Sequence, residues 1–169
     1  MKEQLKQGEW VLVVSNRFWW HYVYAFSLSI KVFQWLLGFR HWEYNHALRV
    51  KDGYTIEMLG NGRNVEPIEQ WLSKQRRKVI VLRPKQPFAE VEAMPYGYAD
   101  IPQIIGHYLR KNVLKRGNTW NGRDGVKKWP GYFCSEEIGR ACGIENPHLL
   151  LPCQIPGMDC LEYVGELET

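Results

Sequence analysis

The two residues best suited to chemistry are a cysteine and a histidine that lie far apart in the chain. Cys134 stands in GYFCSEEIGRACG (131–143), where a short amphipathic helix is expected to begin. Backbone N–H groups at a helix start are unpaired, so they favour a thiolate and can hold a developing oxyanion. Cys134 is therefore the candidate nucleophile. The alternative is an inert buried cysteine, as we expect for Cys142 on the inner face of the same helix.

His46 is the candidate general base. It begins HALRV (46–50), which has the character of a strand, and Glu57 lies in the next expected strand, YTIEML (54–59). Lys-Asp-Gly joins the two stretches and signals a hairpin turn, so His46 and Glu57 are expected to be neighbours on one face. A carboxylate there would hold the imidazole in one tautomer and stabilise its protonated form. Thiol, base and orienting group together are the parts of an activated nucleophile.

Other residues compete for these roles. His41 is an alternative base, although it falls in the polar turn before the strand, and Glu43 is an alternative to Glu57. A metal site built from His41, His46, Glu57 and cysteines is poorly supported by the spacing, and the chain has no Cys-x-x-Cys pair. We therefore expect neither a metal nor another cofactor.

Composition indicates an ordinary globular protein. The chain has 169 residues, of which 45% are hydrophobic and 24% charged, and this suits a single domain over residues 1–169. The net charge of +4 is mild and only residues 74–78, KQRRK, are densely basic, so no nucleic-acid partner is expected. The first ten residues contain no apolar segment, so no signal peptide is expected. A cytoplasmic location with free thiols follows as the prediction.

Residues 18–39 are rich in aromatic and aliphatic side chains and have the length of a membrane span. His21, Lys31 and Gln34 interrupt the run, so we expect an amphipathic helix packed on the domain, with Ser27, Lys31 and Gln34 on its polar side. Peripheral contact with a membrane surface is the alternative interpretation. The expected apolar stripe consists of Trp19, Val23, Phe26, Ile30, Phe33 and Leu37.

The order of the expected elements is that of an α+β fold with an antiparallel sheet. Strands are predicted at 9–14, 46–50, 54–59 and 78–84, and helices at 18–39, 67–75, 100–114 and 134–142. In the helix over 100–114, the inner side is expected to carry Ile104, Ile105, Tyr108 and Leu109. Residues 60–64 and 115–131 are expected to be loops, and prolines in the tail, 146–169, exclude a long helix there.

Several of these stretches resemble the circularly permuted NlpC-type papain-like hydrolases, the YiiX-like group, which are related to the lecithin retinol acyltransferase-like proteins. The stretches are GEWVLVV, YNHALRV, YTIEML and YFCSEEIGRACGI, within about residues 8–145. In this group the histidine strand precedes the cysteine helix, the reverse of the order in ordinary papain-like enzymes. The resemblance implies a permuted papain-like fold, with an antiparallel sheet packed against the helix of the nucleophile Cys134. It also implies His46 as the base and, with a looser match, Glu57 as the third member.

The chain departs from this group in places. Asn45 stands before the histidine where a small residue is common, and Gly139 lies inside the expected helix. The tail, 146–169, has no counterpart in the resemblance.

The sequence thus predicts a cysteine hydrolase, an amidase, peptidase or acyl hydrolase, or else an acyltransferase. It would cleave an amide or ester of peptide, cell-wall or lipid origin through an acyl-enzyme. Tyr96 and Tyr98, in PYGYAD, are expected to border the substrate cleft, and packing is the alternative role for both. The alternative function is a non-catalytic lipid-, peptide- or cell-wall-binding module on the same fold.

Overall fold

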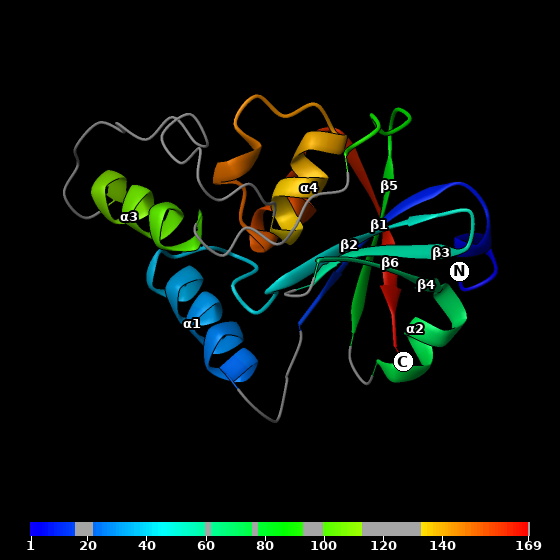
Figure 1. Ribbon diagram of the computed structural model, residues 1–169, viewed down its shortest axis with the longest axis horizontal. Helices are drawn as coiled ribbons and strands as arrows, with labels where there is room; N and C mark the ends of the chain where they lie inside the picture. The colour runs from blue at the N-terminus through cyan, green and yellow to red at the C-terminus, as the bar shows by residue number, and fades with distance from the viewer. Residues whose placement is uncertain (16–21, 60–61, 76–77, 93–99, 113–132, 169) are drawn as a thin grey trace.

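A computed structural model gives the fold (Figure 1). The structure describes residues 1–15, 22–59, 62–75, 78–92, 100–112 and 133–168, without the side chains of 22–27, 100–103, 111 and 112. Within these residues the fold is α+β, with a six-stranded antiparallel sheet and several helices, so the predicted fold class is confirmed. The permuted papain-like arrangement stays a prediction.

The sheet has the order β4-β3-β2-β1-β5-β6. The strands are β1 (Glu9–Val14), β2 (His46–Lys51), β3 (Tyr54–Leu59), β4 (Gly62–Pro67), β5 (Val79–Pro84) and β6 (Leu161–Leu167). The α-helices are α1 (Tyr22–Leu36), α2 (Ile68–Lys74), α3 (Asp100–Asn112) and α4 (Cys134–Ala141). Short 3-10 helices are η1 (Gln4–Lys6), η3 (Pro147–Leu149) and η4 (Pro152–Gly157).

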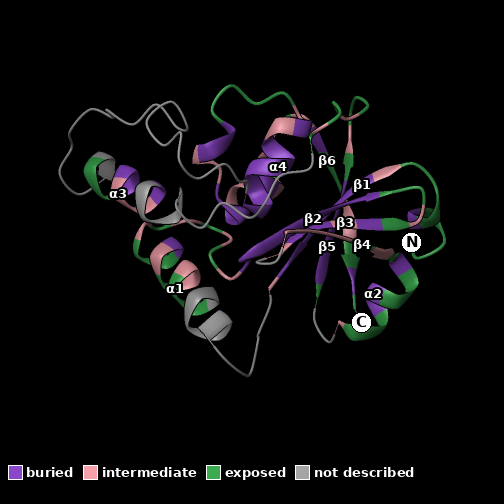
Figure 2. Ribbon diagram, in the orientation of Figure 1, coloured by how far each residue is buried: buried purple, intermediate pink, exposed green. Residues whose placement is uncertain are grey.

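The core lies on both faces of the sheet, with β1 at its centre. Even-numbered residues of β1 pack in one apolar cluster with Trp71 of α2, and odd-numbered residues pack in another with Ile138 of α4. Burial on both sides explains why β1 reads as a continuous apolar run without alternation. Figure 2 shows the buried residues concentrated in the central strands and α4. The helix that begins at Cys134 is thus fixed against one face of a rigid sheet.

The predicted hairpin between β2 and β3 is present. Its two turn residues, Asp52 and Gly53, have φ angles of 48° and 82°. A two-residue turn with both φ angles positive matches the right-handed twist of the flanking strands, and Asp-Gly is well suited to it. This turn sets the register that brings the two expected site strands together.

The sequence did not predict two strands at the edges of the sheet. Residues 62–64, expected to lie in a loop, begin β4, and the tail contributes η3, η4 and β6. Both strands lie at an edge, where one side of the backbone has no neighbouring strand, and β4 has little apolar alternation. Gly165 interrupts β6, opposite a register shift between Val81 and Leu82. Both strands were missed because a strand is predicted from regular alternation of apolar and polar residues, and polar residues and glycine interrupt that alternation here.

The prediction that Lys31 and Gln34 lie on an exposed polar side of the helix over 18–39 is wrong. Gln34 is fully buried, and the side chain of Lys31 donates a hydrogen bond to Ser15 Oγ at 2.8 Å. The Gln34 amide donates to the carbonyls of Trp42 and Tyr44 at 2.8 and 2.7 Å, so it supports the chain that leads into β2. A buried amide is tolerated because these hydrogen bonds satisfy it.

The outward face of α1 is instead apolar. Its exposed large side chains are Leu28, Val32, Trp35 and Leu36. Ile30, Phe33 and Leu37 of the expected stripe are half-buried, Trp19 lies outside the described residues, and nothing is described of the side chains of Val23, Phe26 and Ser27. In the part of the chain that the structure describes, no helix is both long and apolar enough to cross a membrane.

Most of the side chains expected on the inner side of α3 are buried or partly buried. Ile104 and Tyr108 are buried and Ile105 is partly buried, whereas Leu109 is 43% exposed. Leu109 follows Tyr108 by one residue, a rotation of about 100° around the helix, and this places it at the margin of the apolar stripe.

Gly139, the unexpected glycine within α4, marks a close approach between α4 and η3. A Cβ atom built at Gly139 would lie 3.0 Å from Pro147 Cβ and 3.2 Å from both Pro147 Cα and Leu150 Cδ2. The absence of a side chain allows η3 to pack directly on the helix that carries Cys134.

We predict that Gly139→Ala lowers the free energy of unfolding by about 1–2 kcal/mol, because overpacking outweighs the gain in helix propensity. Chemical denaturation measures the change. The matched control is Gly106→Ala in α3, where a Cβ would meet nothing within 4 Å. The control is expected to leave stability unchanged or raise it by up to about 1 kcal/mol. Equal effects of the two substitutions would contradict the close approach.

Candidate active site

His46 and Glu57 meet across the β2–β3 hairpin. The strands pair with Arg49 opposite Ile56, and continuing that register makes His46 and Glu57 diagonal neighbours on one face. His46 Nε2 lies 2.7 Å from Glu57 Oε1, and the two residues are only 8% and 6% exposed. The carboxylate accepts a hydrogen bond from the ring and thereby fixes which nitrogen carries that proton. The expected proximity of these two side chains is confirmed.

Cys134 lies at the start of α4, as expected. The preceding residue, Phe133, has extended backbone, and its side chain makes no capping hydrogen bond to the helix. Ser135 Oγ donates a hydrogen bond to the Leu150 carbonyl at 2.6 Å, which fixes the first turn against the chain after η3. Cys134 is itself buried. Its sulfur is therefore held beside the first backbone N–H groups of α4.

The thiol of Cys134 and the imidazole of His46 are in contact. Burial alone would lower the pKa of His46, but the charge of Cys134, a hydrogen bond with it and the Glu57 carboxylate together raise that pKa to about 10. The imidazole therefore keeps its proton well above the pH at which an ordinary histidine loses it. The structure thus brings Cys134, His46 and Glu57 together from α4, β2 and β3.

The competing residues lie elsewhere. His41 contacts Tyr44, with ring centroids 6.1 Å apart, and among the described residues no interaction links His41 or Glu43 to Cys134. Tyr96 and Tyr98 fall outside the described residues. His46 is therefore the histidine that the fold places beside the thiol.

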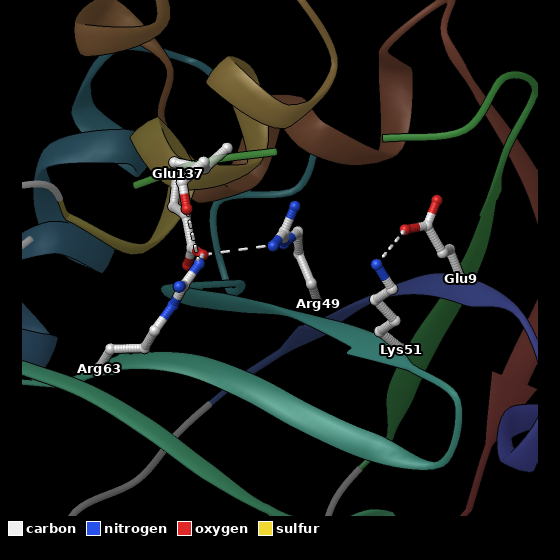
Figure 3. Close-up of polar contacts among 6 residues, drawn as sticks. Glu9, Arg49, Lys51, Arg63 and Glu137 are labelled. Atoms are coloured by element: carbon white, nitrogen blue, oxygen red, sulfur yellow. Dashed lines mark hydrogen bonds and ion pairs between the residues drawn. The ribbon is translucent and has the colours of Figure 1, made fainter. Parts of the chain in front are cut away.

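A buried ion-pair cluster, which the sequence did not reveal, anchors α4 to the sheet (Figure 3). Glu137 Oε1 lies 2.9 Å from a guanidinium nitrogen of Arg63 and 3.7 Å from Nε of Arg49. Glu137 is almost fully buried, and Arg63 also donates to the Val91 carbonyl at 3.2 Å. The cluster joins α4 to β2 and β4 one turn after Cys134. Its only sequence signal is a carboxylate in the first turn of the helix, which is equally typical of an exposed helix start.

An apolar pocket opens beside the thiol. Its volume is about 30 Å³, room for one or two groups of the size of water or methyl. Cys134 is part of its wall, and the rest comes from α1, α3 and residues next to α4 and η4: Ile30, Phe33, Ile104, Ile105, Phe133, Leu151 and Pro152. Among the described residues, none that lines the wall carries a charge, so any group seated there is expected to be apolar.

The described residues contain no cluster of three or more histidine, cysteine or carboxylate side chains arranged to hold a metal ion. All four cysteines carry free thiols. Cys142, expected to be buried on the inner face of the helix, follows the end of α4 and is only partly buried.

Comparison of the sequence with known protein families and curated proteins, and of the structure with solved structures, gives no match. The resemblance to permuted papain-like hydrolases therefore stays a prediction, and function is inferred from the geometry of this site.

We predict that the pKa of His46 falls in both Glu57→Gln and Cys134→Ala. Each substitution removes negative charge that stabilises the imidazolium, so each variant loses the ring proton at a lower pH than the intact protein. Titration of the imidazole signals by NMR measures the change, with His46→Gln used to assign them. Glu69→Gln, which changes an exposed carboxylate on α2, is the control and should leave the His46 titration unmoved. An unchanged His46 pKa in both site variants would contradict the geometry described above.

Proposed function

We propose that the protein is a thiol hydrolase or acyltransferase that cleaves an amide or ester through Cys134, His46 and Glu57. The observation that carries the proposal is the contact of a thiol at a helix start with an imidazole that a buried carboxylate orients. Nucleophile, base and orienting group are the requirement for covalent acyl transfer.

In the first half of the proposed reaction, Cys134 attacks the substrate carbonyl. His46 carries the proton of the Cys134 thiol as the imidazolium, and Sγ bonds to the carbonyl carbon to give a tetrahedral oxyanion. The backbone N–H of Cys134, at the start of α4, would hold that oxyanion. The intermediate collapses, the leaving amine or alcohol departs with the proton from His46, and a thioester remains.

In the second half, an acceptor releases the acyl group. His46 takes a proton from water, the oxygen attacks the thioester carbon, and the cysteine sulfur leaves and regains the proton. The products are a carboxylic acid and the free thiol. An alcohol or amine in place of water would make the protein an acyltransferase. Glu57 stabilises the imidazolium in both halves but transfers no proton itself.

The pocket beside Cys134 favours a substrate with an apolar acyl group. Aliphatic and aromatic side chains of α1 and α3 form much of its wall, with Cys134 at its edge. Transfer of an apolar group from water into a pocket with such walls is favourable by about 25 cal/mol per Å² of apolar surface buried. An ester of an apolar carboxylic acid is therefore the first substrate to test.

We predict that a chromogenic ester with an apolar acyl group, such as p-nitrophenyl butyrate, acylates Cys134 and is turned over. Cys134→Ala should show no added acyl mass and a rate reduced by about 10³-fold or more, because the covalent route is lost. His46→Gln should lose about 10²–10⁴-fold. Intact-mass spectrometry after a short incubation detects the acyl group, and release of nitrophenolate measures turnover.

Cys153→Ala is the matched control for this experiment. Cys153 is also buried, and packs with Phe133 in the apolar cluster that adjoins the pocket, but it is not part of the triad. The control should acylate as the intact protein does. Acylation that persists in Cys134→Ala, or that vanishes equally in Cys153→Ala, would count against the proposed nucleophile.

The apolar outer face of α1 favours a second candidate function, peripheral binding to a lipid surface. Trp35 and Leu36 are 59% and 68% exposed, and with Leu28 and Val32 they fit one face of the helix. α1 has 15 residues, about 22 Å, which suits a helix lying in the interface. The net charge of +4 favours an anionic surface.

We predict that the protein co-sediments with vesicles containing phosphatidylglycerol and that Trp35→Glu reduces the bound fraction several-fold. Val65→Glu is the matched control, since Val65 is similarly exposed but lies on β4. No sedimentation of the intact protein, or equal loss in both variants, would remove this candidate without affecting the proposed chemistry.

A further inference from the structure

Two cysteines that the proposed chemistry does not use lie together at the far end of α4. Cys142 directly follows the helix, and Cys160 directly precedes β6. Their side chains are in hydrogen-bond contact, both are partly buried, and both are free thiols. Cys134 is the first residue of α4, so nearly the whole length of the helix separates it from this pair. The pair is thus distinct from the candidate active site.

The pair lines a cavity of its own. The cavity has a volume of about 270 Å³ and is lined by Phe88, Cys142 and Cys160, among others, with exposed Lys85, Gln86 and Asp159 also in its wall. This volume greatly exceeds what one water molecule needs. A small oxidant can therefore reach both sulfurs from solvent.

The backbone around the pair is fixed by one shared segment. After β5, the N–H of Lys85 donates to the Cys160 carbonyl at 3.0 Å, and the N–H of Ala89 donates to the Ala141 carbonyl at 2.9 Å. The same short segment thus holds both cysteine-bearing stretches. Two thiols in hydrogen-bond contact are close enough for one sulfur to attack the other once that sulfur has been oxidised.

We propose that Cys142 and Cys160 are an oxidative modification site, at which a hydroperoxide converts the two thiols into an intramolecular disulfide. One cysteine sulfur attacks the outer oxygen of the hydroperoxide, the O–O bond breaks, and an alcohol or water leaves, so that a sulfenic acid remains. The other sulfur attacks the sulfenic sulfur, and the hydroxyl departs as water with the thiol proton. The two thiols lose two protons and two electrons in total, and the hydroperoxide is reduced by the same two electrons.

Burial and the neighbouring Cys160 thiol both raise the pKa of Cys142, whereas the nearby Arg49 guanidinium acts in the opposite sense. A protonated thiol reacts slowly with peroxide. A sulfenic acid on either cysteine leads to the same disulfide, because the remaining sulfur closes the bond.

The disulfide would tie the end of α4 to the start of β6, two elements that Figure 1 shows close together. Such a bond closes a loop of moderate length between positions 142 and 160 and restricts the unfolded chain. The oxidised form is expected to melt about 5 °C or more above the reduced form.

The test uses the full chain with Cys134→Ala, so that the result is independent of the proposed nucleophile. Treatment of the reduced protein with hydrogen peroxide should remove two hydrogens from the intact mass, and a non-reducing peptide map should join the peptides of Cys142 and Cys160. Dithiothreitol should reverse both the mass change and the rise in melting temperature. Adding Cys153→Ser, which changes a cysteine in a separate cluster, should leave the reaction intact.

Adding Cys142→Ser should abolish the loss of two hydrogens and leave Cys160 as a sulfenic acid, which a dimedone probe captures. The proposal is overturned if peroxide adds only oxygen atoms to the Cys134→Ala protein. It is equally overturned if the mapped disulfide joins any other pair, or if Cys142→Ser still loses two hydrogens.

Discussion

A buried imidazole keeps a proton only where nearby negative charge replaces the stabilisation that water would give, and this constraint governs the candidate site. The positive charge of the His46 ring is stabilised from two sides, by Glu57 on the neighbouring strand and by Cys134 at the start of α4. Neither contact alone would describe a functional site, because a histidine paired with a carboxylate also occurs in purely structural roles. The combination with a thiol at a helix start makes the arrangement suited to covalent chemistry.

The contact depends on how firmly α4 is placed against the sheet. Glu137 binds Arg49 and Arg63 from two strands, Ser135 binds the chain after η3, and Gly139 allows η3 to approach the helix. A buried ion pair contributes little net stability, because desolvation offsets much of the attraction. Its effect here is geometric, since Glu137 links α4 to two strands of the sheet at once. The position of the Cys134 sulfur thus depends on the contacts that the following residues of α4 make.

Sequence reasoning reached the central part of the site, because the signals there are local. The Asp-Gly turn fixes the β2–β3 register, and the register alone makes His46 and Glu57 neighbours. The proximity of Cys134 to that pair did not follow from spacing, since it depends on packing between segments about ninety residues apart. It was expected only because a thiol nucleophile needs a base.

Other features could not be predicted, for physical reasons. The exposed face of α1 could not be predicted because Gln34 is polar and was expected to face solvent. Gln34 is buried only because the backbone carbonyls of Trp42 and Tyr44 accept hydrogen bonds from its amide. The edge strands β4 and β6 lack regular alternation, and the Glu137 cluster joins residues whose charges suggest an exposed surface. Each of these depends on partners that sequence spacing does not reveal.

The pairing of Cys134 with His46 is tested most directly by the pH dependence of alkylation at Cys134, followed by peptide mass spectrometry with iodoacetamide. The account predicts that the intact protein reacts readily near neutral pH, and that His46→Gln reacts there at least about tenfold more slowly, approaching the profile of an ordinary thiol with a pKa of about 8.5. Superimposable profiles for the two proteins would contradict it, because the imidazole would then have no influence on the sulfur.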